Sequence, residues 1–165
     1  GLRGELKKLQ KNLGITTLYV THDQEEALTL SDRIAVFNNG FVEQVDKPYN
    51  IYNHSGSEFV CDFIGEINRL NASVLSEITT QTGYALDGSK GGYVRLERIR
   101  LNEIPGYAKL HGVIRDYDYN GVMTKYRVEV MGCELRVIHV NDGQPFMEIG
   151  QELDIYVNPR DIMQF

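Results

Sequence analysis

The sequence of 165 residues has no tryptophan, only four prolines and only two cysteines. Cys61 and Cys133 lack C-x-x-C spacing, which argues against a disulfide framework or a zinc site and favours a reducing compartment. No apolar run reaches the roughly 20 residues that a membrane-spanning helix needs. Positive charge is not in excess either. The net charge of −6 argues against a surface built to bind nucleic-acid phosphates.

The hydrophobic content of 42% is sufficient, in a chain of this length, for one core or two small ones. Near the start, Leu2, Leu6, Leu9 and Leu13 have helical spacing. This spacing predicts a helix that ends at Gly14.

The segment around His22 is the most informative part of the sequence. The apolar run 15–21 predicts a strand buried on both faces, and His22 follows it directly. Asp23 is expected to cap a helix over residues 24–30, with Glu26 reaching back to the cap in a capping box. Ligands of open α/β sheets lie beyond the carboxyl ends of the strands, so His22 is a candidate to contact a phosphate or a water. The alternative is a polar residue at the sheet rim.

The next segments carry local signals. Residues 34–37 and 41–45 flank Asn-Asn-Gly, which predicts a hairpin. Two short helices are expected at residues 48–52 and 58–64, the second capped by a serine and ended by a glycine. Cys61 lies on the apolar face of the second helix, where we interpret it as a small buried hydrophobic residue.

From about residue 68 the pattern changes to short β-rich runs separated by turn residues. Runs of this length and spacing predict a small antiparallel barrel. We therefore expect two domains, residues 1–67 and 68–165. The β-rich runs are 70–78, 84–86, 93–101, 108–117, 124–130, 134–140 and 152–157.

Four segments resemble one known family. Residues 13–34, which include Thr-His-Asp-Gln-Glu-Glu-Ala, are similar to the switch-histidine segment of ATP-binding subunits of ABC importers for polyamines, sugars, sulfate or iron. The string Phe63-Ile64-Gly65-Glu66-Ile67-Asn68 is close to the polyamine branch. Residues 94–101 and 111–121 resemble the regulatory oligonucleotide-binding-type (TOBE) domain of these subunits, although Leu96 stands where a proline is usual.

The resemblance implies an α+β protein: the C-terminal part of an α/β P-loop ATPase core, followed by a small β-barrel. It implies that His22 contacts the γ-phosphate of ATP and positions the attacking water in the intact subunit, which uses ATP and Mg²⁺. The implied partners are a second ATPase subunit, transmembrane permease subunits and, indirectly, an extracytoplasmic solute-binding protein, with no nucleic acid. The implied location is the cytoplasmic side of the plasma membrane, and polyamine import is favoured.

The sequence contains no Gly-x-x-x-x-Gly-Lys-Ser/Thr loop. In the resembled family this loop precedes the first helix, so we expect a C-terminal fragment that neither binds ATP and Mg²⁺ well nor hydrolyses ATP. The expected strand 15–21 would then lack a neighbour, and we expect chain-to-chain packing to cover its edge.

Two other functions remain open: a ligand-sensing or dimerisation barrel, and a barrel that binds single-stranded nucleic acid. The second alternative would use a stacking platform of tyrosines. Separately, five arginines are candidates for a local anion pocket, although alternating charges on half-buried strands usually face solvent. The remaining histidines, His54, His111 and His139, show no ligand spacing, so no metal site is expected. The candidate tyrosines are Tyr117, Tyr119 and Tyr126. The candidate arginines are Arg95, Arg98, Arg100, Arg115 and Arg127.

Overall fold

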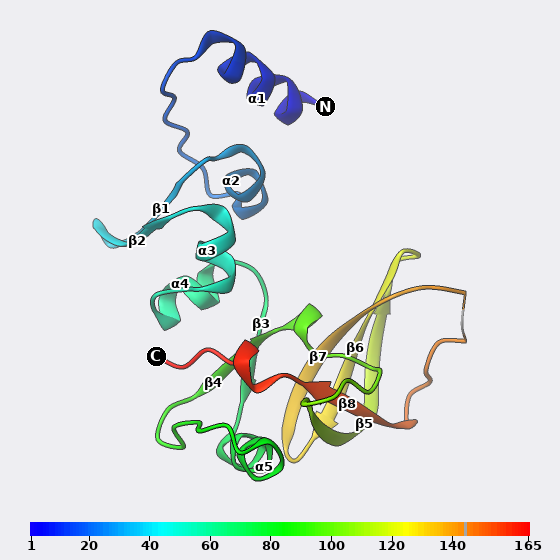
Figure 1. Ribbon diagram of the computed structural model, residues 1–165. Coiled ribbons are helices and arrows are strands. Elements are labelled where there is room, and N and C mark those ends of the chain that lie inside the picture. Colours follow the sequence, from blue (N-terminus) through cyan, green and yellow to red (C-terminus); the bar gives the residue numbers. More distant parts are fainter. Residues whose placement is uncertain (144) are drawn as a thin grey trace. The chain divides into compact units, whose positions relative to one another are not determined.

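The structure is a computed structural model that describes residues 1–143 and 145–165. The chain divides into two compact units, Gly1–Gly65 and Glu66–Phe165 (Figure 1). Both units contain helices and strands. No helix among the described residues is long and apolar enough to span a bilayer.

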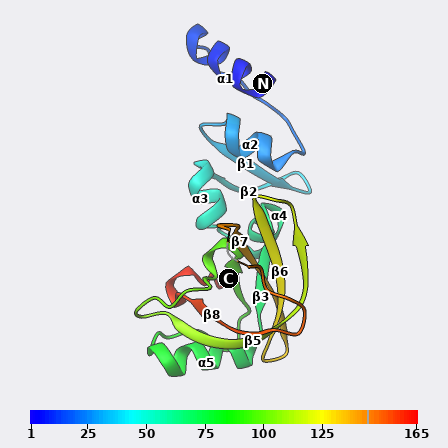
Figure 2. The ribbon, with the colours of Figure 1, turned by 90° about the vertical axis from the view of Figure 1, so that its right-hand side faces the viewer.

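Unit 1 is built around one β-hairpin. Its tight turn is possible because Asn39 and Gly40 adopt positive φ angles of 50° and 81°, the conformation that Asn-Gly turns favour. Helices α3 and α4 both lie beside strand β2 (Figure 2). The predicted helices and hairpin of this unit are confirmed. The elements are α1 (Leu2–Leu13), α2 (Gln24–Leu30), β1 (Ile34–Asn38), β2 (Phe41–Asp46), α3 (Pro48–Asn53) and α4 (Glu58–Phe63).

The core of unit 1 is small. Four partly buried side chains pack against it: Ala27 and Leu28 of α2, Tyr52 and Phe59. Helix α1 contributes no buried residue and ends, as predicted, at Gly14 in the left-handed conformation. The buried core side chains are Ile34, Val36, Ile51, Val60 and Ile64.

The predicted strand at residues 15–21 is wrong. The segment forms no strand, and Leu18 and Val20 are 91% and 85% exposed. A strand buried on both faces needs partner strands at its edges and helices over its faces. None of the described strands pairs with this segment, so its apolar residues remain uncovered, and the strand edge expected to drive chain-to-chain packing is not formed.

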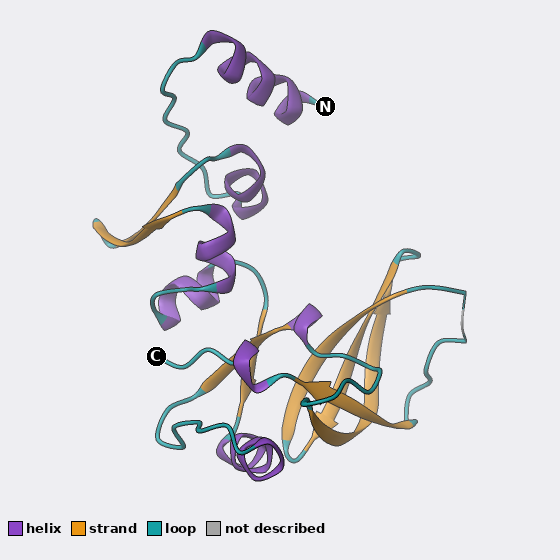
Figure 3. Ribbon diagram, viewed as in Figure 1, coloured by secondary structure: helices purple, strands orange, loops and turns teal. Residues whose placement is uncertain are grey.

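The described residues of unit 2 form two antiparallel sheets, the helix α5 and short 3₁₀ segments (Figure 3). One sheet has the order β7-β6-β5-β8, and the other pairs β3 with β4. The elements are β3 (Ile67–Leu70), α5 (Ala72–Thr82), β4 (Gly92–Arg95), β5 (Ala108–Tyr119), β6 (Met123–Val130), β7 (Cys133–Val140) and β8 (Glu152–Val157), with short 3₁₀ turns at Leu96–Arg98 and Pro159–Asp161.

The strand predicted at residues 70–78 is a helix for most of its length. The Asn71 side chain accepts a hydrogen bond from the Val74 N–H and caps α5, while Gly83 ends the helix in the left-handed conformation. Val74 and Ile78 are both fully buried on one helix face. Their β-branched side chains favoured a strand in the sequence, but the two caps and the core-facing spacing stabilise a helix. The run 84–86 is also not a strand.

The Asn68 side chain pairs with the backbone across the two sheets of unit 2. The Asn68 amide, 2% exposed, donates to the Arg136 carbonyl at 2.8 Å and accepts from the Arg136 N–H at 2.8 Å. These are the two bonds that a neighbouring backbone would make with β7. Two isolated bridges, Tyr93 with Met163 and Arg100 with Tyr156, extend the pairing elsewhere.

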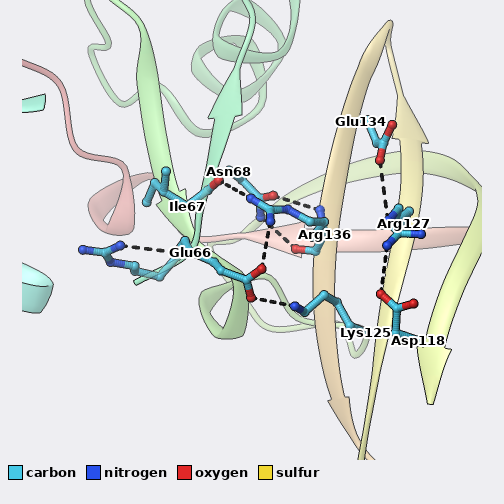
Figure 4. A network of polar contacts seen from close by, with 9 residues as sticks. Glu66, Ile67, Asn68, Asp118, Lys125, Arg127, Glu134 and Arg136 are labelled. Carbon is cyan, nitrogen blue, oxygen red and sulfur yellow. Dashed lines mark hydrogen bonds and ion pairs between the residues drawn. The ribbon is translucent and has the colours of Figure 1, made fainter. Parts of the chain in front are cut away.

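Glu66, next to this join, is held by two cations (Figure 4). Its carboxylate accepts from Lys125 Nζ at 2.7 Å and from Arg136 Nη1 at 3.0 Å. Arg136 also donates through Nη2 to the Ile67 carbonyl at 2.7 Å. The hydrogen bond from Lys125, and then the charges of Lys125 and Arg136, lower the pKa of Glu66. The start of β3 is thus fixed to β6 and β7.

Gly112→Ala is expected to destabilise unit 2. A methyl group at Gly112 would lie 2.5 Å from Val128 Cγ1 and 2.8 Å from Val130 Cγ2, so β5 and β6 would have to separate. Overpacking of this kind costs about 1–3 kcal/mol, which urea denaturation measures. The control is Gly88→Ala, where a methyl group meets nothing within 4 Å. Equal stability of the two variants would contradict the close approach of β5 and β6.

Glu66→Gln is expected to lower stability near neutral pH only. Because the folded-state pKa of Glu66 is depressed, its carboxylate stabilises the fold above the unfolded-state pKa of about 4.3. That contribution is lost as the pH falls through the folded-state pKa. The side chain is 48% exposed, which limits the effect to about 1 kcal/mol.

The measurement is urea denaturation at about pH 7 and about pH 3, on either side of the pH range in which Glu66 becomes protonated. Glu103→Gln is the control, because Glu103 is exposed and forms no ion pair with the described residues. A loss of stability in Glu66→Gln that is the same at both pH values would show that the charge of Glu66 does not stabilise the fold.

Candidate functional site

His22 lies at the corner between the extended segment 15–21 and α2. Its side chain is exposed and forms no hydrogen bond or ion pair with the residues that the structure describes. Asp23 is the N-cap of α2, and its carboxylate accepts from the Glu26 N–H at 3.2 Å. The imidazole is therefore presented to solvent from a capped helix start.

The second half of the predicted capping box is wrong. Glu26 does not reach the Asp23 N–H, because the Thr21 hydroxyl already accepts from that N–H at 2.9 Å. The Glu26 carboxylate instead accepts from the Tyr19 hydroxyl at 2.8 Å and from the Thr21 hydroxyl at 3.2 Å. These bonds hold Tyr19 and Thr21, which precede His22, to the first turn of α2.

The charged side chains beside His22 are mostly acidic. Arg3 of α1 lies 2.7 Å from Asp23, 3.6 Å from Glu25 and 3.9 Å from Glu26. Arg3 is 41% exposed, so each pair contributes at most about 1 kcal/mol. The hydrogen bond from Tyr19 to Glu26, and then the Glu26 charge, raise the pKa of Tyr19. The tyrosine therefore remains a neutral donor at this corner.

Gln24 makes a contact that the sequence analysis missed. It is the first residue of α2, as predicted, but its side-chain amide reaches across unit 1. The Nε2 group donates to the Phe63 carbonyl, and Oε1 accepts from the Gly65 N–H at 2.7 Å. The segment that carries His22 is thereby tied to the end of unit 1.

The other histidines and the cysteines do not form a site. No group of three or more metal-binding side chains occurs in residues 1–143 and 145–165. Cys61 and Cys133 are both free and buried. His111 lies 3.3 Å from Asp154 and 3.4 Å from Glu152, and hydrogen bonds to these two carboxylates raise its pKa.

The three tyrosines do not form a stacking platform. Tyr126 is fully buried, and its hydroxyl accepts from the Met147 N–H at 3.1 Å. Tyr117 packs edge-on against Phe146, with ring centroids 5.0 Å apart. Only Tyr119, at 61% exposed, lies largely in solvent.

The candidate arginines do not converge on an anion pocket. Arg115 pairs with Glu129 at 2.6 Å, and Arg127 lies 2.6 Å from Asp116. Arg127 also lies 2.9 Å from Asp118 (Figure 4). Alternating charges of this kind are typical of a solvated sheet face. Arg98 pairs with Asp161. Arg95 is 2% exposed and donates to the Glu66 carbonyl, and the Arg100 backbone pairs with Tyr156.

Comparison with known proteins gives consistent matches. The chain is 38% identical, over 98% of its length, to the spermidine/putrescine import ATP-binding protein of Borrelia garinii subsp. bavariensis, of which it covers 48%. The protein of the same name from Bacteroides thetaiotaomicron is 37% identical over 96% of this chain and 35% of its own length. An ABC transporter ATP-binding protein of Escherichia coli K12 is 44% identical over 79% of this chain and 36% of its own length.

The chain thus spans less than half the length of each of these relatives. Residues 93–165 match the family model of the TOBE domain. Together the matches confirm the resemblance predicted from residues 13–34, 63–68, 94–101 and 111–121. Residues 93–165 are thus similar to the TOBE domain, and nearly the whole chain is similar to the ATP-binding proteins of spermidine/putrescine importers.

Proposed function

We propose that this chain is the C-terminal part of an ATP-binding subunit that drives solute import by hydrolysing ATP. Residues 1–67 would be the end of the nucleotide-binding domain, and residues 68–165 the regulatory domain. The observation that carries this proposal is the match over 98% of the chain to a spermidine/putrescine import ATP-binding protein. The exposed imidazole of His22 at a capped corner supports it.

His22 would act on the γ-phosphate of ATP. Phosphoryl transfer is catalysed mainly by positioning and by stabilising negative charge, and a histidine near neutral pH can donate to a phosphate oxygen. Bound Mg²⁺ would neutralise charge on the phosphates. Among the described residues, no group of three or more histidine, cysteine or carboxylate side chains could hold a metal ion.

The proposed partners follow from the same relationship. A second ATPase subunit would complete the dimer, and transmembrane permease subunits would respond to its closure on the cytoplasmic side of the membrane. An extracytoplasmic solute-binding protein would deliver the cargo to the permease. The names of the relatives favour spermidine or putrescine as that cargo.

His22→Ala in the complete subunit is expected to reduce kcat for ATP hydrolysis by about 100- to 1,000-fold. This is the usual effect of removing one group that stabilises the developing charge. Because His22 is exposed and forms no hydrogen bond within the described part of the chain, the variant should unfold at the same temperature as the wild type. Steady-state phosphate release and thermal unfolding measure the two quantities.

The matched control is His54→Ala, which removes another exposed histidine of unit 1 and should leave kcat unchanged. Undiminished hydrolysis by His22→Ala, or an equal loss in both variants, would remove the proposed role of His22.

The 165-residue chain by itself is expected to release no phosphate from ATP above background. Its residues include no glycine-rich loop to hold the phosphates, so His22 has no bound nucleotide on which to act. A coupled phosphate assay on the purified chain tests this. Hydrolysis that persists through purification and disappears in His22→Ala would show that the chain contains a complete site.

A further inference from the structure

The His22 side chain has no contact of its own that fixes its position. It is exposed and forms no hydrogen bond or ion pair within the described part of the chain. The position of the imidazole therefore depends on the backbone of the corner between the extended segment and α2. This position matters for the proposed role in ATP hydrolysis, because misplacing a reacting group by about 1 Å can slow a reaction by about 100-fold.

A closed ring of three hydrogen bonds surrounds the His22 backbone. The Asp23 N–H donates to the Thr21 hydroxyl oxygen at 2.9 Å, which forms a turn across His22. The Thr21 hydroxyl donates to Glu26 Oε1 at 3.2 Å. The Glu26 N–H in turn donates to the Asp23 carboxylate at 3.2 Å. Each of these three residues is bonded to the other two, and His22 lies between two of them.

The second oxygen of Glu26 holds the segment that precedes the ring. Oε2 accepts from the Tyr19 hydroxyl at 2.8 Å, so the carboxylate uses one oxygen for each hydroxyl. Arg3 Nε lies 3.9 Å from Oε2, which is beyond hydrogen-bonding distance. The Glu26 side chain is only 21% exposed, which limits competition from water for these bonds.

Helix capping alone does not account for this use of Glu26. A glutamate that only helps a helix to begin binds the backbone N–H of the cap residue, which here is the Asp23 N–H. That N–H donates to Thr21 instead, and Glu26 binds two hydroxyls of the segment before His22. The carboxylate therefore connects α2 to the residues on the N-terminal side of His22.

We propose that Thr21 and Glu26 are positioning residues for His22, and that their ring of hydrogen bonds holds the imidazole in one place. As a contribution to catalysis, this rests on the proposed role of His22 in ATP hydrolysis. Residue 21 must accept from the Asp23 N–H and donate to Glu26 through the same atom. A hydroxyl group can do both, so serine should replace Thr21 and valine should not.

The first measurement is the NMR order parameter of the His22 backbone N–H in the 165-residue chain. A held corner should give about 0.85 in the wild type, and Thr21→Val should lower the value below about 0.6. Thr21→Ser should retain the wild-type value. Thr21 lies outside the buried core of unit 1, so all these variants should fold.

The matched control is Thr29→Val, because the Thr29 hydroxyl donates to carbonyls of α2. This variant should leave the His22 order parameter unchanged. A low value in the wild type, a wild-type value in Thr21→Val, or equal losses in Thr21→Val and Thr21→Ser would overturn the proposal.

The same measurement tests Glu26. Glu26→Ala removes the acceptors of both hydroxyls and should lower the His22 order parameter as Thr21→Val does. The control is Glu25→Ala, which removes the adjacent carboxylate, 79% exposed and 3.6 Å from Arg3. Equal order parameters in Glu26→Ala and Glu25→Ala would show that Glu26 does not position His22.

The second measurement is the kinetics of ATP hydrolysis by the complete subunit. Thr21→Val should lower kcat about tenfold to 100-fold and leave KM for ATP within about twofold, because a misplaced His22 weakens the transition state rather than the binding of ATP. Thr21→Ser and Thr29→Val should retain the wild-type kcat. A rise in KM without a fall in kcat would contradict a positioning role.

The double variant separates positioning from a general loss of structure. If Thr21 acts only through His22, then Thr21→Val should lower kcat by less than about twofold in the His22→Ala background. A loss as large as in the wild-type background would show that Thr21 acts independently of His22, which would overturn the proposal.

Failure of this proposal can be distinguished from failure of the proposed function. If His22→Ala leaves hydrolysis by the complete subunit intact, the proposed function fails, and the order parameters still decide whether Thr21 and Glu26 hold the corner. If hydrolysis depends on His22 but Thr21→Val retains the wild-type kcat and order parameter, only the positioning role fails.

Discussion

The Asn68 side-chain amide is the buried polar group that joins the two sheets of the second unit. The strands β3 and β7 share no ladder of backbone hydrogen bonds, and Asn68 supplies both the donor and the acceptor that the Arg136 backbone needs. The amide is 2% exposed, and a buried polar group without a partner costs about 1–3 kcal/mol. Its fixed position also sets where Glu66 lies, since Glu66 is two residues upstream and reaches the neighbouring cations.

Local signals predicted much of the first unit. The hairpin was predictable because Asn39 and Gly40 readily adopt positive φ angles, and α4 because Ser57 caps its first turn. The absence of a strand at residues 15–21 was not predictable. Whether an apolar run becomes a strand depends on partner strands that no local pattern reveals. Residues 72–82 form a helix instead of the predicted strand because the Asn71 side chain caps its first turn, which outweighs the strand preference of Val74 and Ile78.

The candidate site was predictable only in its local part. Placing His22 after an apolar run and before a capped helix required neighbours in sequence alone, and the Asp23 cap formed as expected. The Gln24 contact is different, since its two partners lie 39 and 41 residues further along the chain. The capping box did not form either, because the Thr21 hydroxyl accepts the hydrogen bond from the Asp23 N–H that Glu26 was expected to accept.

The hydrogen-bond partners of Gly65 and Glu66 belong to different units, which has a practical consequence for protein engineering. The Gly65 N–H is satisfied by a side chain of unit 1, whereas the Glu66 carboxylate and carbonyl are satisfied by side chains of unit 2. A chimaera that exchanges second domains between relatives should therefore be spliced at the single peptide bond between these residues. A crossover even one residue to either side would pair a donor from one parent with an acceptor from the other.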